Sequence, residues 1–173
     1  SSECIAHVPH WKIFNSGTSW DIIKSVAKWL TEKETDGLLL YGTVGSGKSV
    51  MAEAIRTVLF SVGKKSSKTT ALDLSNYAIN RNDNDLYDSL KFSEILIIDD
   101  LGEEPKFVKS YGNDFAPLIE VLYYRYDKQL MTIITTNLLE EQIENIYGSR
   151  ITDRFDETFD KKYFSQESYR KIK

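Results

Sequence analysis

Residues 42–49 read GTVGSGKS, and their types and spacing are those of a loop that binds phosphate groups. The segment fits the pattern G-x-x-x-x-G-K-[ST] through Gly42, Gly47, Lys48 and Ser49. Glycines let backbone N–H groups approach phosphate oxygens closely, and the start of a following helix adds partial positive charge. We expect Lys48 to reach the β- and γ-phosphates of a nucleotide and Ser49 to bind Mg²⁺.

The segments on either side of this loop favour nucleotide binding. An apolar run at residues 38–41 predicts a buried strand before the loop, and apolar residues at helical spacing follow it from Met51 to Leu59. A glycine-rich loop without nucleotide is the alternative, which this strand–loop–helix context disfavours. The expected nucleotide-binding residues are Gly42, Thr43, Val44, Gly45, Ser46, Gly47, Lys48, Ser49 and Val50.

Two acids, Asp99 and Asp100, follow a second apolar run at residues 95–98, which predicts a strand buried on both faces. We expect Asp99 to hold Mg²⁺, mostly through water, and Asp100 to polarise the water that attacks the γ-phosphate. Two acids after a strand could instead simply begin a turn. A further β-rich run, residues 69–72, lies between the two motifs and favours an additional-strand ATPase over a nucleotide kinase, whose arginine-rich lid is not found.

Polar residues also end the next predicted strand, with the sequence Thr135-Thr-Asn137. A polar side chain at such a strand tip can hydrogen-bond the γ-phosphate or the attacking water. Asn137 is the preferred residue for this role, and Thr136 is the second choice. Asn137 could instead cap the helix expected from Leu139, and the two roles are compatible.

Arg150 and Arg154 lie four residues apart, so a helix would place them on one face. An arginine supplied by a neighbouring subunit can accelerate phosphoryl transfer by about 10³- to 10⁵-fold. We expect Arg150 to act in this way. The alternative is a surface salt bridge, for example with Asp153 or Glu157.

The connection at residues 101–114 is long for a link between a strand and a helix. It carries Lys106, Phe107, Lys109 and Tyr111, a mixture suited to phosphate contact and base stacking in single-stranded DNA. Alternatively, the aromatic side chains pack on the sheet and the lysines are solvated. A second basic segment, better explained as a solvated loop, contains Lys64, Lys65 and Lys68.

Helices and strands alternate along the rest of the chain, which predicts an α/β domain with a mostly parallel sheet. The predicted strands are residues 38–41, 69–72, 94–98, 131–135 and 163–164. The predicted helices are residues 18–31, 50–60, 115–126, 139–146 and 150–157, with a further helix capped by Asp73 or Ser75 that runs to Ala78. The expected organisation is an N-terminal arm and first helix at 1–34, followed by a compact domain at 35–173.

Composition limits the classes of function. The chain has 173 residues, of which 41% are apolar and 28% charged, and its net charge of −4 gives no general argument for nucleic-acid binding. One cysteine, Cys4, excludes an internal disulfide and fits the cytoplasm. There is no apolar run of membrane-spanning length and no signal-peptide pattern. Because the chain starts at Ser1, a missing N-terminal domain is an open expectation. Residues 1–17 could cover the core or contribute to an adenine pocket.

Taken in order, GTVGSGKS, IIDDLG, TTN and SRITDRF resemble AAA+ ATPases of the DnaC-type helicase-loader clade and its IstB-type relative in transposition. The resemblance covers roughly residues 35–171 and includes Glu167-Ser-Tyr-Arg170. It implies a three-layer P-loop fold with a five-stranded parallel sheet of order 5-1-4-3-2. It also implies ATP with Mg²⁺, oligomers with arginine fingers acting in trans, single-stranded DNA and a replicative helicase as partner. Two features of the family find no match in this sequence, an N-terminal helicase-binding domain and a clear C-terminal helical lid. The sensor-2 arginine, which such a lid carries, is therefore not assigned.

Three functional hypotheses follow. The first is an ATPase, slow and dependent on an oligomer, that loads a replicative helicase onto single-stranded DNA. The second is an IstB-like ATP-dependent regulator of a transposase. The third is a nucleotide-binding interaction module with negligible turnover.

Overall fold

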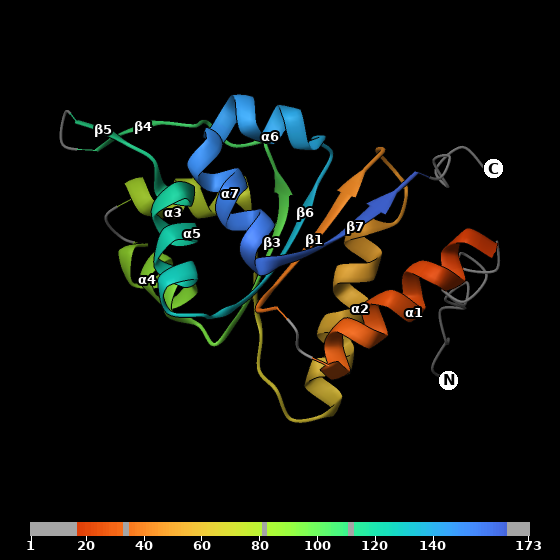
Figure 1. Ribbon diagram of the computed structural model, residues 1–173. Coiled ribbons are helices and arrows are strands. Elements are labelled where there is room, and N and C mark those ends of the chain that lie inside the picture. Colours follow the sequence, from red (N-terminus) through yellow and green to blue (C-terminus); the bar gives the residue numbers. More distant parts are fainter. Residues whose placement is uncertain (1–16, 33–34, 81–82, 111–112, 166–173) are drawn as a thin grey trace, which may run out of the picture. The chain divides into compact units, whose positions relative to one another are not determined.

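A five-stranded parallel sheet forms the centre of the computed structural model, which describes residues 17–32, 35–80, 83–110 and 113–165. Its strands lie in the order β2-β3-β6-β1-β7, and every neighbouring pair is parallel (Figure 1). The strands are β1 (Gly37–Gly42), β2 (Ser67–Thr70), β3 (Ile95–Leu101), β6 (Met131–Thr136) and β7 (Phe159–Phe164). When only these five strands are counted along the chain, their order is 5-1-4-3-2. The predicted α/β class is confirmed.

Helices cover both faces of this sheet and complete a three-layer arrangement (Figure 1). Helix α2 (Lys48–Ser61) lies on one face and buries Met51 and Ile55. The opposite face carries the main apolar cluster, to which successive strands contribute alternate residues such as Leu39, Leu96 and Ile134. The helices of that face are α3 (Ala71–Ile79), α4 (Asn84–Phe92), α5 (Pro117–Asp127), α6 (Glu140–Tyr147) and α7 (Ser149–Thr158).

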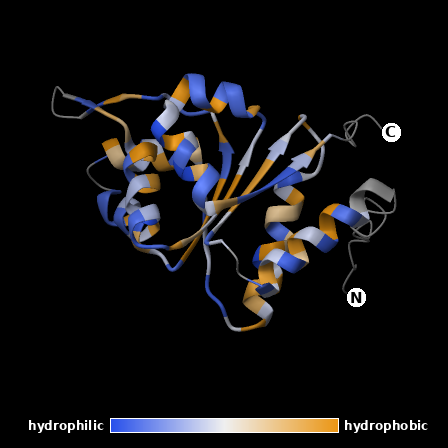
Figure 2. Cartoon of the chain, in the orientation of Figure 1, coloured by the Kyte–Doolittle hydropathy of each residue, from blue (hydrophilic) through white to orange (hydrophobic). Residues whose placement is uncertain are grey.

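Hydropathy follows this layering. Figure 2 shows α6 as a largely hydrophilic helix, and its buried residues are Ile143 and Tyr147. The central strands β1 and β3 are buried along nearly their whole length because both faces are covered. Among the described residues, no helix is long and apolar enough to cross a membrane.

The chain divides into two compact units, Ser1–Glu34 and Thr35–Lys173. The described part of the first unit is α1 (Gly17–Glu32), which corresponds closely to the predicted helix at 18–31. The N-terminal arm at residues 1–16, Tyr111 and the 167–170 segment lie outside the described residues.

Three predicted elements need correction. The connection at 101–114 contains most of an antiparallel hairpin, β4 (Val108–Ser110) with β5 (Asn113–Phe115), and is not irregular throughout. Helix α3 is capped by Thr70, whose Oγ1 accepts the N–H of Asp73 at 3.0 Å, so neither Asp73 nor Ser75 is its cap. The reason is that β2 ends at Thr70 and the helix begins at once.

The last strand was predicted too short. Strand β7 has six residues rather than two, and it includes Asp160, Lys161 and Lys162. These charged residues conceal the strand in the sequence because they are not an apolar run. An outer strand has one unpaired edge, where charged side chains are common because they discourage pairing with other chains.

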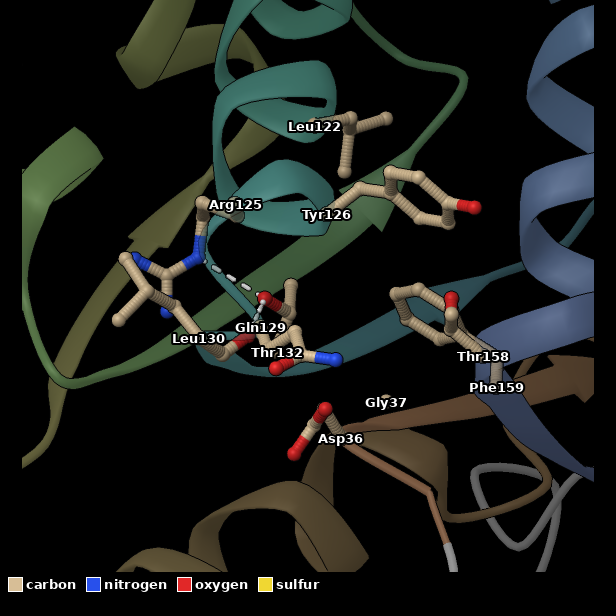
Figure 3. Close-up of a pocket in the computed structure, with 10 residues that line it drawn as sticks. All are labelled: Asp36, Gly37, Leu122, Arg125, Tyr126, Gln129, Leu130, Thr132, Thr158 and Phe159. Carbon is tan, nitrogen blue, oxygen red and sulfur yellow. Dashed lines mark hydrogen bonds between the residues drawn. The ribbon is translucent and has the colours of Figure 1, made fainter.

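One buried cation connects α5 with the rest of this unit. Arg125 is 1% exposed, and its guanidinium donates to Thr132 Oγ1 at 2.8 Å, Ser93 O at 2.8 Å and Met131 O at 2.7 Å. Burial lowers the pKa of Arg125 to about 10. Arg125 also lines a cavity of about 20 Å³, shown in Figure 3, which has room for a water molecule and not for a nucleotide. We therefore assign Arg125 a structural role.

Candidate nucleotide site

The glycine loop between β1 and α2 has the backbone geometry that phosphate binding requires. Gly42 and Gly47 have φ values of 128° and 98°, which side-chain-bearing residues rarely adopt. A Cβ atom on Gly42 would lie 2.2 Å from the carbonyl oxygen of Phe164. That same oxygen accepts the N–H of Thr43 at 3.0 Å. The loop is therefore fixed in place by the end of β7, a contact that the sequence did not reveal.

Lys48 is buried within this loop at 5% exposure. Its ammonium donates to Gly42 O at 3.0 Å and to Thr43 O at 2.7 Å, so it spans the space enclosed by the loop. Burial lowers the pKa of Lys48, and the nearby charges of Asp100 and Asp99 oppose that shift. The arrangement keeps a cation within the glycine loop.

The start of α2 offers unoccupied donors to an anion. Gly47 precedes the helix in the left-handed conformation, and no side chain of the described residues caps it. A Cβ on Gly47 would meet nothing within 4 Å, so the backbone borders open space at this point. Helix N–H groups without intrahelical partners and a partial positive charge suit phosphate oxygens. The residues present therefore fit a nucleotide.

The acidic end of β3 lies beside this loop. Asp99 is 8% exposed, and its Oδ1 accepts hydrogen bonds from Ser49 Oγ at 2.9 Å and from Thr135 Oγ1. A hydroxyl and a carboxylate at hydrogen-bond distance are hard oxygen donors of the kind that Mg²⁺ prefers. Among the described residues, no group of three or more acidic, histidine or cysteine side chains could hold a metal alone. The pair therefore fits Mg²⁺ that nucleotide phosphates also coordinate.

Asp100 occupies a strained backbone position next to Asp99. Its φ is 58°, which is uncommon for a residue other than glycine, and the strand pairing is irregular between Ile98 and Leu101. The N–H of Asp100 donates to Thr135 Oγ1 at 3.0 Å. Thr135 thus contacts both acids and positions the end of β3. Sequence reasoning named the Thr135-Thr-Asn137 stretch but assigned no role to Thr135.

Thr136 and Asn137, at the end of β6, differ in their contacts. Thr136 Oγ1 donates to Leu101 O at 2.6 Å, so it also holds β3. Asn137 is half-buried and precedes the helix without capping it. The cap of α6 is Leu139, whose N–H donates to Gln142 Oε1 at 2.8 Å. The capping alternative for Asn137 is therefore wrong, and its contact with the γ-phosphate stays a prediction.

The two arginines of α7 have separate environments. Arg150 is exposed, and no hydrogen bond or ion pair joins it to another described residue. Arg154 stacks on Tyr123 and Tyr126, with its guanidinium carbon 4.1 and 4.4 Å from the ring centroids. Its Nη1 atom lies 3.6 Å from Asp127 Oδ1. Arg154 is thus held within its own chain, whereas Arg150 is available to another molecule.

The basic side chains also separate into two groups. On the hairpin side, Lys106 and Lys109 are exposed, and Phe107 is 54% exposed rather than packed on the sheet. In the other basic segment, Lys64 pairs with Glu94 at 3.1 Å. The ammonium of Lys68 lies 3.5 Å from Asp99 Oδ2, a contact that the sequence did not predict.

Together, the sheet order, the loop after β1 and the acidic pair after β3 define a P-loop domain of the AAA+ fold. Comparison with solved structures identifies close matches of the same fold. DnaI is 22% identical, with a TM-score of 0.72 and coverage of 89% of this chain and 85% of DnaI. The DnaC helicase loader is 20% identical, with a TM-score of 0.70 and coverage of 87% and 92%.

A replication initiator shares the fold as well. AMPPCP-bound DnaA from Aquifex aeolicus is 16% identical, with a TM-score of 0.68, and the match covers 94% of this chain and 52% of DnaA. No protein-family model matches the chain, and no curated protein is similar to it at a significant level. At these identities the likeness is one of fold, and it is the DnaC-type AAA+ fold that the sequence motifs predicted.

Proposed function

We propose that this chain is the ATP-binding and ATP-hydrolysing AAA+ domain of a replicative helicase loader that acts on single-stranded DNA. One observation carries the proposal. Lys48, Ser49 and Asp99 converge at the glycine loop in a fold shared with the DnaC helicase loader and with a DnaA structure that contains AMPPCP. A replicative helicase as partner would place the protein in the cytoplasm.

Each residue of the site has a chemical role in this proposal. The loop amides and Lys48 bind and neutralise the phosphates, while Ser49 and Asp99 hold Mg²⁺, which would balance the charge on the phosphate oxygens. Asp100 orients the attacking water and accepts its proton, and Asn137 orients the γ-phosphate or that water. In an oligomer, Arg150 of one copy supplies positive charge to the site of the next.

Turnover separates this proposal from the alternative of a binding module without hydrolysis. We expect slow phosphate release from ATP. The rate per protein chain should rise with protein concentration and with added single-stranded DNA. Tight nucleotide binding with no phosphate release under any of these conditions would favour the binding module. An IstB-like role would instead be indicated by stimulation with a transposase and not with a helicase.

A further inference from the structure

Lys68 forms an ion pair with Asp99, the carboxylate that we propose holds Mg²⁺. Its Nζ lies 3.5 Å from Asp99 Oδ2 and 3.3 Å from Glu53 Oε2. Its side chain is 28% exposed, and that of Asp99 is 11% exposed. The ammonium is therefore placed between two carboxylates, one in the nucleotide site and one on α2.

The sheet explains how a residue of a basic segment reaches this site. Strand β2 is parallel to β3, with Thr70 opposite Asp99, so Lys68 lies two residues before that pair on the same strand face. A lysine side chain is long enough to extend along β3 to the carboxylate. The hydroxyls of Ser49 and Thr135 occupy Oδ1 of Asp99, and Lys68 approaches the other oxygen.

Glu53 gives this ammonium a second partner. Arg56 donates to Glu53 Oε1 at 2.9 Å, which leaves Oε2 for Lys68. A small movement of the lysine could thus exchange one carboxylate for the other without loss of an ion pair. Such an exchange matters because Mg²⁺ and an ammonium at the same carboxylate repel each other.

We propose that Lys68 is a positioning residue, an inference that rests on the proposed function. While Mg²⁺ and nucleotide are absent, Lys68 is the counter-ion of Asp99. When they bind, Lys68 leaves Asp99 and keeps its ion pair with Glu53. In the empty site, Lys68 offsets the charge of a nearly buried carboxylate. During binding, it competes with the metal for that carboxylate. Lys68 therefore sets the Mg²⁺ concentration at which the site fills.

The test is the Mg²⁺ dependence of nucleotide binding, measured with a fluorescent, non-hydrolysable ATP analogue, together with direct Mn²⁺ binding by electron paramagnetic resonance. Lys68→Met should lower the half-saturating Mg²⁺ concentration by about three- to tenfold, the effect of one unit charge at a partly exposed site. Glu53→Gln should raise it, because Lys68 then has Asp99 alone as partner. Lys68→Arg, which keeps the charge, should resemble the wild type.

Lys64→Met is the matched control. It removes the same charge from the same segment, but Lys64 pairs with Glu94 instead of Asp99, so its Mg²⁺ dependence should equal that of the wild type. If Lys68→Met leaves the Mg²⁺ dependence unchanged, or weakens nucleotide binding equally at every Mg²⁺ concentration, the inference is wrong while the proposed function stands. If the wild type binds no nucleotide, both fail.

Discussion

Lys48 illustrates how the chain arranges charge at single residues before any ligand arrives. Its buried ammonium donates hydrogen bonds to two carbonyl groups of the loop, those of Gly42 and Thr43. Its lowered pKa, caused mainly by burial, means that the folded protein holds this proton less tightly than a free lysine would. An anion in the loop would restore that stabilisation.

The first prediction concerns this residue. Lys48→Ala should weaken the binding of ATP with Mg²⁺ by roughly ten- to hundredfold, because charge-assisted hydrogen bonds to phosphate are lost. Isothermal titration calorimetry measures the change directly. Lys65→Ala, at an exposed lysine, is the control and should bind like the wild type. Equal affinities for the wild type and Lys48→Ala would contradict the assignment.

Residues of the site differ in how far the sequence can reveal them. Lys48, Ser49 and Asp99 belong to local motifs whose spacing is set by one loop or one strand end. The sequence alone is therefore enough to name them as candidates. Thr135 and Lys68 act across strands, on acids of β3 that are distant in the chain. Their partners depend on strand order and register, which a local pattern does not contain.

At the scale of elements, the long strands and amphipathic helices are predictable, but the hairpin β4–β5 is not. Its strands have three residues each and include Asn113 and Asp114, which have low strand propensity. In Figure 1 the hairpin extends away from the sheet. Lys109 and Asp114 pair across it while both remain largely exposed, so the pair contributes little stability and leaves the lysine accessible.

The second prediction tests this hairpin as a DNA contact. The double substitution Lys106→Glu with Lys109→Glu should abolish binding to a labelled single strand at low salt, because the protein is acidic overall and binding should depend on these two lysines. Fluorescence anisotropy with ATP present measures the loss. Nucleotide affinity should not change.

A charge-matched control distinguishes the hairpin from the other basic segment. Lys64→Glu with Lys65→Glu makes the same change of net charge and should leave DNA binding intact. If this control abolishes binding and the hairpin variant does not, the contact with DNA lies at the segment of Lys64 and Lys65.

A second link between elements joins the loop after β3 to the end of α6. Tyr147 OH donates to Glu104 Oε1, and the N–H of Gly102 donates to Glu104 Oε2 at 2.9 Å. Burial raises the pKa of Glu104, and the hydrogen bonds from Tyr147 and Gly102 oppose the shift. The link connects the residues that follow Asp100 with the helix end that precedes Arg150.

The third prediction follows from this raised pKa. The folded state binds the Glu104 proton more tightly than the unfolded state, so the contribution of Glu104 to the free energy of unfolding falls as pH rises from 4.5 through the raised value. Compared with the wild type, Glu104→Gln should therefore be more stable at pH values above this range than at pH values below it. Tyr147→Phe should lose about 1–3 kcal/mol at pH 7, because Glu104 Oε1 then loses the hydroxyl that donates to it. Chemical denaturation at several pH values measures both, and a pH-independent difference for Glu104→Gln would refute the argument.

At the scale of the whole molecule, the two arginines of α7 differ in whether they can reach another copy of the chain. Arg154 is held against α5 by two tyrosine rings, which anchors the helix, while Arg150 is exposed at its first turn. An anchored helix with an exposed arginine can present a cation to a neighbouring copy in a defined position. The geometry thus suits an active site shared between subunits.

The fourth prediction tests this sharing. Lys48→Ala and Arg150→Ala should each lose hydrolysis, and a mixture of the two should recover part of it, because some interfaces combine an intact phosphate loop with an intact Arg150. Phosphate release under conditions in which the wild type assembles measures the recovery. Each variant alone at doubled concentration is the control. Mixtures as inactive as the single variants would exclude a role for Arg150 in trans.

The contact between Phe164 and the phosphate loop has a mechanical consequence. The carbonyl oxygen of Phe164, at the end of the outer strand β7, holds the N–H of Thr43 and lies against Gly42. Tension applied to the chain beyond Phe164 would act first on this contact and then unzip β7 from β1. A tethered molecule would therefore lose the alignment of its glycine loop at a lower force than the one that unfolds its sheet.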